Sequence, residues 1–214
     1  MDPIDIANSK SLEQFTADYL PSSNKWRTWI HPTTKTEYQI TLQTAKALSQ
    51  FEFDTCFHLI ELTSIEDYKK SEDGWKPRSK RREMKLLDLK YMLVKLDNQV
   101  EGFVSFMPTY EDDYPVIYCY EIHLSSDLQG SGLGRVLMQY LDFIGEKIPG
   151  TAKVMLTCFL SNIRGVAFYQ KLGYAKDEFS PPPKILRNGT KVEGDYVILS
   201  KSVDSAVSEV PGCD

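Results

Sequence analysis

A glycine-rich stretch, Gln129-Gly130-Ser131-Gly132-Leu133-Gly134-Arg135, separates a strand-like run from a segment with the apolar spacing of a helix. Glycines let backbone N–H groups approach a ligand because no Cβ stands in the way. The first turn of the helix that follows leaves its N–H groups unpaired and carries a positive partial charge. The stretch therefore predicts an anion site suited to a pyrophosphate.

Three kinds of glycine-rich loop compete for this position, and two of them need residues that are absent. A dinucleotide fingerprint, Gly-x-Gly-x-x-Gly, requires glycine where this chain has Arg135 or Leu137. A phosphate-binding P-loop requires Gly-Lys-Ser/Thr, which the stretch lacks. The third pattern, Gln/Arg-x-x-Gly-x-Gly/Ala, is satisfied by Gln129, Gly132 and Gly134.

The segments on either side of the loop indicate the fold class. Strands are expected at 38–45, 91–97, 100–110, 116–124, 153–160 and 195–203, and helices at 53–71, 133–148 and 162–171. Tight turns join the three strands between residues 91 and 124, which predicts an antiparallel meander. Strands and helices then alternate, so we expect an α+β (mixed α/β) domain.

The 214 residues divide into three parts. Residues 1–35 are expected to form an N-terminal arm with one short helix around 11–19, residues 36–203 the folded domain, and residues 204–214 a polar tail. A net charge of −5 argues against direct nucleic-acid binding. No run of about 18 apolar residues is present and the first residues lack an apolar signal core, so we expect neither a membrane span nor secretion.

No metal site is expected. The four cysteines, Cys56, Cys119, Cys158 and Cys213, form no Cys-x-x-Cys pair, and the three histidines are scattered. A basic run at 76–85 is typical of a solvated helix start, with a nuclear-import signal as the alternative. Both the nucleus and the cytoplasm therefore stay open as locations.

The glycine-rich stretch and the segment after residue 160 resemble the GNAT superfamily of N-acetyltransferases. The resemblance rests on Gln129, Gly132 and Gly134, on Asn162, and on the run Phe168-Tyr169-Gln170-Lys171-Leu172-Gly173-Tyr174. It implies the GNAT fold, which has a central, mostly antiparallel sheet with a splayed strand pair and flanking helices. It also implies acetyl-CoA as the co-substrate.

The GNAT resemblance further implies how the co-substrate is bound. A bulge near the end of the strand at 116–124 splays it from the strand at 153–160, and a freed N–H near Leu124 stabilises the oxyanion. Backbone groups in this region bond to the pantetheine arm. The implied cofactor-binding residues are Ile122, His123, Leu124, Gln129, Gly130, Ser131, Gly132, Leu133, Gly134, Arg135 and Asn162.

A narrower resemblance, to the NatD-type N-alpha-acetyltransferases that modify histone N-termini, spans most of residues 35–203. It rests on Asp73-Gly74-Trp75-Lys76, Arg82-Glu83-Met84, Tyr118-Cys119-Tyr120-Glu121, Lys153-Val154-Met155-Leu156-Thr157 and Asp195-Tyr196. It implies a free α-amine on a histone tail that begins Ser-Gly-Arg-Gly. The sequence gives no sign of an auxiliary subunit, and none is expected.

The catalytic candidates are Glu121, Tyr120 and Tyr169. Glu121 is expected to act as the base through a water, since an α-amine with a pKa near 8 needs only a weak base. Its alternative role is a strand carboxylate in a salt bridge. Strict alternation puts Glu121 on the opposite face from Tyr118 and Tyr120, unless the bulge re-aims it. Tyr169 is the expected general acid.

The NatD-type resemblance also implies a peptide site rich in phenols, each of which offers an apolar wall and a polar tip. The implied substrate-binding residues are Tyr68, Thr109, Glu111, Tyr118, Tyr120, Thr157 and Tyr196. Glu111 is expected to pair with the substrate Arg. Thr109 stands where the family has an acidic residue, so Asp112 and Asp113 are alternatives. Asp73 stands where the family tends to have Trp.

Two other functions stay open. The same fold could acetylate lysine side chains or a small amine, and lysine, with a pKa near 10.4, needs more help to lose its proton. The chain could also be a non-catalytic acyl-CoA-binding module. The intact residues Gln129, Gly132, Gly134 and Asn162 count against that alternative.

Overall fold

The structure, a computed structural model, describes residues 2–185, 187 and 189–203. The strands are β1 (Thr28–Ile30), β2 (Glu37–Thr44), β3 (Lys90–Leu96), β4 (Gln99–Glu111), β5 (Tyr114–Leu124), β6 (Lys153–Phe159), β7 (Ala175–Lys176), β8 (Lys184–Ile185), β9 (Lys191–Val192) and β10 (Tyr196–Ser202). The α-helices are α1 (Pro3–Ser9), α2 (Leu12–Tyr19), α3 (Gln50–Lys70), α4 (Pro77–Glu83), α5 (Leu133–Lys147) and α6 (Ile163–Lys171).

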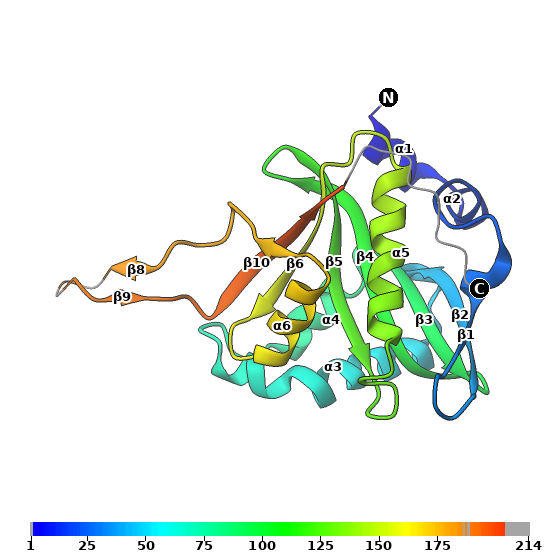
Figure 1. Cartoon of the computed structure of the whole chain (residues 1–214), viewed down its shortest axis with the longest axis horizontal. Coiled ribbons are helices and arrows are strands. Elements are labelled where there is room, and N and C mark those ends of the chain that lie inside the picture. Colours follow the sequence, from blue (N-terminus) through cyan, green and yellow to red (C-terminus); the bar gives the residue numbers. More distant parts are fainter. Residues whose placement is uncertain (1, 186, 188, 204–214) are drawn as a thin grey trace.

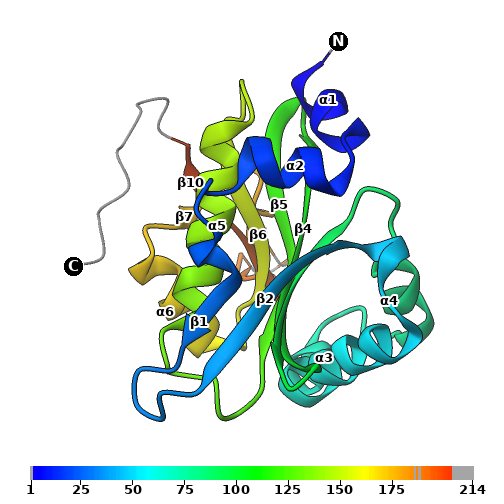
Figure 2. The same ribbon diagram turned by 90° about the vertical axis from the view of Figure 1, so that its right-hand side faces the viewer.

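Eight of these strands form one sheet in the order β1-β2-β3-β4-β5-β6-β10-β7, and β8 pairs with β9 in a separate hairpin. Within this sheet only the β5–β6 pair is parallel. Helices α5 and α6 lie on one face, and α3 and α4 lie on the other (Figures 1 and 2). The predicted α+β fold with a mostly antiparallel sheet is therefore confirmed.

The meander of β3, β4 and β5 agrees with the prediction. Its two turns contain non-glycine residues with positive φ, Asp97 and Asn98 in the first and Asp112 and Asp113 in the second. Asn and Asp tolerate this left-handed conformation, which matches the twist of a tight hairpin. The second turn ends the acidic segment that begins at Glu111.

Helix α5 follows the glycine-rich stretch, as its apolar spacing predicts. Its side chains at Leu133, Leu137, Leu141 and Ile144 have no exposed area, and they form part of the core between α5 and the sheet. Helix α3 begins with a capping box, in which Ser49 and Glu52 bond to each other's backbone N–H groups. No described helix is both long and apolar enough to cross a membrane.

The N-terminal arm is more ordered than the single predicted helix. Helix α2 begins directly after its Ser11 cap, close to the expected place, but α1 precedes it and Asp2 caps α1. Phe15 and Trp26 are buried in the same core cluster as α5. Strand β1 adds to the edge of the sheet by pairing with β2. The predicted polar tail at 204–214 lies outside the described residues.

Candidate active site

A bulge in β5 turns Glu121 toward the face that α3 covers. Ser105 of β4 pairs with Glu121 while the next residue, Phe106, pairs with Cys119, so Tyr120 is the extra residue. Past the bulge, Glu121 and His123 bond to side chains of α3. The bulge thus resolves the conflict that strict alternation creates, because Tyr120 and Glu121 now share one face.

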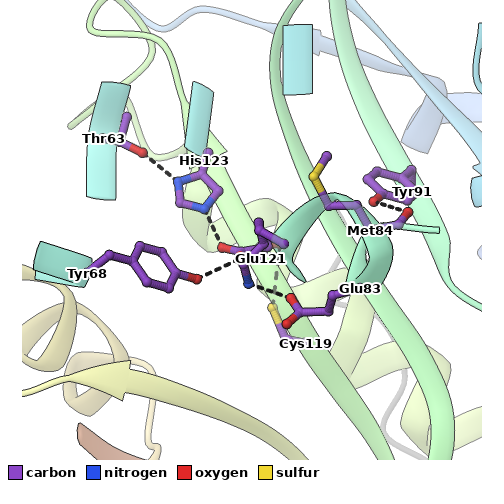
Figure 3. A network of polar contacts seen from close by, with 9 residues as sticks. Thr63, Tyr68, Glu83, Met84, Tyr91, Cys119, Glu121 and His123 are labelled. Carbon is purple, nitrogen blue, oxygen red and sulfur yellow. Dashed lines mark hydrogen bonds and ion pairs between the residues drawn. The ribbon is translucent and has the colours of Figure 1, made fainter. Parts of the chain in front are cut away.

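Glu121 is the centre of a polar network (Figure 3). Its carboxylate accepts hydrogen bonds from Lys80 Nζ at 2.7 Å and from the Tyr68 hydroxyl at 3.2 Å. Its second oxygen lies 2.5 Å from His123 Nε2, and His123 Nδ1 lies 2.5 Å from the Thr63 hydroxyl. Lys80 also pairs with Glu83, the last residue of α4. Side chains from α3, α4 and β5 therefore hold the Glu121 carboxylate in place.

This network keeps Glu121 ionised. Burial alone would raise the pKa of Glu121, but the nearby Lys80 and His123 outweigh burial and lower it to about 2. Burial alone would lower the pKa of Lys80, and the Glu121 carboxylate reverses this and raises it. Burial raises the pKa of Glu83. The ion pairs of the alternative role are thus present, and the role of Glu121 as a base stays a prediction.

The strands β5 and β6 part where the co-substrate is expected. They pair from Val116 with Lys153 to Cys119 with Leu156, and no pairing follows. Residues 120–124 of β5 therefore have a strand neighbour only on the β4 side. Ile122, His123 and Leu124 all lie in this open part. His123, expected as a backbone contributor, also bonds Glu121 through its ring, which the sequence did not indicate.

The glycine-rich loop leads into the free end of α5. Gly132 is the N-cap of α5 and has φ +94°. Being glycine, it has no side chain that could cap the helix. Gly134 lies close to α6, because a Cβ on it would stand 3.3 Å from Phe168 Cζ. The Leu133 N–H donates to the Ser131 hydroxyl at 3.5 Å, and the rest of this first turn, which has no side-chain cap, is suited to an anion such as a pyrophosphate.

The other expected cofactor residues divide into surface and structural positions. Gln129 Nε2 donates to the Leu124 carbonyl at 3.0 Å and so ties the loop to the end of β5. The Ser131 hydroxyl donates to the Leu128 carbonyl at 2.5 Å. The Leu133 side chain is buried, whereas Gly130 and Arg135 are exposed. Asn162 caps α6 by accepting from the Gly165 N–H at 2.8 Å.

Tyr169 lies in the core next to the parting strands. It is 9% exposed and belongs to the cluster that contains Cys119, Leu156 and Cys158. Burial raises the pKa of Tyr169 well above its ordinary value, so its hydroxyl keeps its proton at neutral pH. The expected role as general acid stays a prediction.

Phenols and other aromatic rings gather on the α3 face. The Tyr118 hydroxyl lies 2.6 Å from the Thr157 hydroxyl, and its ring centroid lies 5.3 Å from that of Tyr120. The rings of Tyr68 and Phe159 pack edge to face, with their centroids 4.8 Å apart. Tyr196 pairs with Phe159 across the sheet and is 38% exposed. The structure thus brings Tyr68, Tyr118, Tyr120, Thr157 and Tyr196 to one region.

The acidic turn lies at one end of this region. Glu111 is close enough to raise the pKa values of Tyr118 and Tyr120 through its charge, in addition to the effect of their burial. Burial and the neighbouring Asp112 raise the pKa of Glu111 itself. Thr109 is the partner of Val116 in the β4–β5 ladder, two residues before Glu111.

Three residues of this region were not expected as site residues. Lys80 was part of the basic run and was interpreted as solvated, yet its side chain is only 10% exposed. The ring centroid of Trp75 lies 4.9 Å from that of Tyr68, so Trp75 contributes an aromatic wall to this region. Asp73 does not, because it pairs with Lys76 on the surface. The Ser105 hydroxyl is buried opposite Glu121 and has no hydrogen-bond partner in the described chain.

No cluster that could hold a metal ion occurs in the described part of the chain. The described cysteines, Cys56, Cys119 and Cys158, are buried free thiols. Burial raises the pKa of each thiol, so none is an activated nucleophile.

Comparisons with known proteins agree with this geometry. The chain is 32% identical to the N-alpha-acetyltransferase 40 of Saccharomyces cerevisiae over 155 residues, which cover 61% of this chain and 54% of that protein. The chain thus spans about half the length of this relative.

Solved structures show the same fold. The PaiA N-acetyltransferase of Thermoplasma acidophilum in complex with coenzyme A has a TM-score of 0.56 at 15% identity, covering 78% of this chain and 99% of that one. The ribosomal-protein-S18-alanine N-acetyltransferase of Escherichia coli has a TM-score of 0.51 at 17% identity, covering 80% and 99%.

Residues 53–174, more than half of the chain, match the family described as the Acetyltransferase (GNAT) family. This match includes the meander, the parted strands and the glycine-rich loop. Members of this family use an acyl-CoA, which agrees with the uncapped N-terminus of α5. The chain belongs to the GNAT family of acetyltransferases.

Proposed function

We propose that this acetyltransferase transfers the acetyl group of acetyl-CoA to the free α-amine of a protein N-terminus. Its proposed substrates are histone tails that begin Ser-Gly-Arg-Gly. The similarity to N-alpha-acetyltransferase 40 supports the class of reaction. The proposal does not include an auxiliary subunit, a nucleic acid or a membrane as a partner, and it places the enzyme in the nucleus and the cytoplasm.

One observation carries the proposal. The parted strands β5 and β6 have different chemistry on their two sides. The α5 side offers an uncapped helix N-terminus after a glycine-rich loop, which suits a pyrophosphate. The α3 side offers a carboxylate and a group of phenols, which suit an amine at the end of a peptide. An acyl donor and a peptide can thus meet where β5 leaves β6.

When bound, acetyl-CoA supplies an acetyl thioester that an amine can attack. Glu121 takes the proton that the amine loses, through a water, because its side chain is held by three protein groups. The unpaired Ser105 hydroxyl lies in register with Glu121 and is suited to hold that water. A backbone N–H near Leu124 faces the developing oxyanion. Tyr169 returns a proton to the thiolate.

The peptide lies along the phenols in this proposal. The aromatic rings of Tyr118, Tyr120 and Tyr196 form walls for a short N-terminal residue, and Thr157 and Tyr68 contribute hydroxyls. Glu111 pairs with the Arg at the third position, as its place beside Tyr118 and Tyr120 supports. The turn residues Asp112 and Asp113 are the alternatives for that contact.

Mass spectrometry of acetylated peptides tests the proposal. A Ser-Gly-Arg-Gly histone peptide with a free N-terminus and the same peptide with a blocked N-terminus are incubated with the protein and acetyl-CoA. We expect one acetyl group on the α-amine of the first peptide and none on the second. Acetylation of lysine in both peptides, or of a small amine alone, would contradict the proposal, and so would binding of acetyl-CoA without transfer.

Two variants test the peptide site. Tyr118→Ala and Tyr196→Ala are expected to raise KM for the Ser-Gly-Arg-Gly peptide by roughly tenfold, because each removes a wall of the site. Calorimetry with acetyl-CoA should give the wild-type Kd for both variants. Unchanged KM values would show that the peptide lies elsewhere.

A further inference from the structure

Lys80 is the basic residue of the run at 76–85 that lies inside the site. Its whole-residue exposure is 9%, and its ammonium lies 2.7 Å from Glu121 and also pairs with Glu83. The ammonium also stands over the Tyr68 ring, 5.3 Å from the centroid. A buried ammonium of this kind requires charged partners, and both of its partners face the reacting region.

The charge balance around Glu121 depends on few groups. Burial raises the pKa of each phenol and thiol near it, so these groups carry no charge at neutral pH; they are Tyr68, Tyr91, Cys119, Tyr120 and Tyr169. Among the described residues, the other titratable groups in direct contact within this network are the carboxyls of Glu121 and Glu83, the Lys80 ammonium and the His123 ring. Lys80 is thus the lysine that offsets the two carboxylates.

The charge state of the reacting nitrogen follows from this balance. Only an uncharged amine can attack a thioester, and an uncompensated carboxylate holds a neighbouring amine as ammonium. A cation at 2.7 Å from that carboxylate offsets this effect. The weak basicity that remains on Glu121 is sufficient, because an uncharged amine releases its proton only as the new C–N bond forms.

We infer that Lys80 is a positioning residue that neutralises Glu121, and that it thereby lets the site hold the substrate amine in its uncharged form. The inference rests on the proposed function, since it assumes that an amine reacts beside Glu121. It assigns a role to α4 that is separate from peptide contact. It also explains why one lysine of an otherwise surface-charged helix is buried.

The test is the pH dependence of the single-turnover rate at saturating peptide and acetyl-CoA, which reports groups in the enzyme–substrate complex. In Lys80→Met we expect a rate up to about tenfold lower at pH 7, with the midpoint of its rise moved up by about one pH unit. At pH 9.5 the rate should return to within about threefold of wild type. KM at pH 7 should fall, because the ammonium form binds more tightly.

Two further variants on α4 control this result. Lys80→Arg keeps the charge and should keep the wild-type midpoint. Arg82→Met removes an exposed cation from the same helix and should change neither rate nor midpoint. A loss in Lys80→Met that is equal at every pH, or no loss at all, overturns the inference.

A third variant keeps the test decisive if Lys80→Met does not fold, which thermal melting and acetyl-CoA calorimetry would show. Glu83→Gln removes a partly exposed carboxylate from the other side of Lys80, so the midpoint should move down by about half a pH unit. An upward shift or no shift contradicts the inference. If wild type acetylates only lysine side chains, the proposed function fails, and the same profiles measured with that peptide still decide the role of Lys80.

Discussion

The two faces of the sheet beside β5 differ sharply in chemistry. Under α5 and α6 the strands contribute Ile117, Cys119 and Leu156 to an apolar core. Under α3 and α4 the same strand β5 contributes Glu121 and His123 to a charged network. Strict alternation would put Glu121 and His123 on the same face as Cys119. The bulge at Tyr120 moves them to the opposite face. The acyl donor and the amine can therefore have separate binding surfaces, and variants on each face should separate their effects.

Glu121→Gln should have the largest effect. The variant loses the carboxylate on the α3 face, so we expect kcat to fall by at least about 100-fold, the range for a lost general base. The Kd for acetyl-CoA should stay at the wild-type value in calorimetry. Full kcat in this variant would show that Glu121 is structural only.

Stability measurements on a double variant control the Glu121→Gln result. Glu121→Gln leaves Lys80 with Glu83 alone, which we expect to lower the free energy of unfolding by about 2 kcal/mol. Lys80→Met combined with Glu121→Gln should recover part of this stability and none of the activity.

Gly132→Ala should affect the opposite face. Alanine is strained at φ +94°, and the variant should displace the first turn of α5 and raise the Kd for acetyl-CoA by about tenfold. The KM for peptide should change little. Gly150→Ala is a matched control, because its φ is +79° and neither position has an atom within 4 Å of an added Cβ. Equal losses of acetyl-CoA binding in the two variants would contradict the assignment of the loop.

Tyr68→Phe should have a moderate effect. The variant removes the 3.2 Å hydrogen bond from the Tyr68 hydroxyl to the Glu121 carboxylate, and we expect kcat to fall about fivefold. Tyr91→Phe is the comparison, since the Tyr91 hydroxyl donates to the Met84 carbonyl at 2.8 Å and not to Glu121. It should lower the free energy of unfolding by about 1 kcal/mol and leave kcat unchanged. Similar kcat values for both variants would remove Tyr68 from the catalytic network.

Glu52→Gln should have the smallest effect on activity, because it lies at the start of α3, away from the Glu121 network. Burial would raise the pKa of Glu52, but Lys95 at 2.5 Å and the Ser49 backbone outweigh burial and lower it to about 2. A carboxyl with a lowered pKa stabilises the fold above pH 4.5, and this contribution disappears as the pH falls toward 2.

Urea unfolding between pH 2 and pH 7 tests this prediction. Glu52→Gln should be less stable than wild type by about 2 kcal/mol at pH 7, and the two proteins should converge near pH 2. Glu66→Gln removes an exposed partner of Lys69 on the same helix and should show no such pH-dependent difference. A constant gap across the whole range would rule out the titration of Glu52 as the cause.

The sequence was most informative where local chemistry decides the structure. The helical spacing from Leu133 to Ile144 predicts α5, and the Asp and Asn turns predict the meander. Ser11 marks the start of α2. A bulge near the end of this strand followed from the family resemblance and not from the residues, because a period of two gives no sign of an inserted residue, and its place at Tyr120 comes from the structure.

The sequence was least informative where tertiary contacts override composition. Lys80 stands in a run with Arg81 and Arg82, and only the packing of α4 against β5 separates the buried member from its neighbours. Helix α1 has seven residues, too few to show a clear period. Glu121 and His123 share a face because they are two residues apart in the strand, and only the bulge at Tyr120 turns that face toward α3.

The short ladder between β5 and β6 also affects how the molecule meets other chains. An unpaired strand margin at the outside of a sheet is open to aggregation, because its N–H and C=O groups can join a foreign strand. Residues 120–124 form such a margin in the interior of the sheet, with α3 and α5 on its two sides. The backbone groups of this margin therefore lie between β4, α3 and α5 and not at an outer edge of the sheet. In the proposed function, these unpaired backbone groups are the ones that bond to the amide-containing arm of acetyl-CoA.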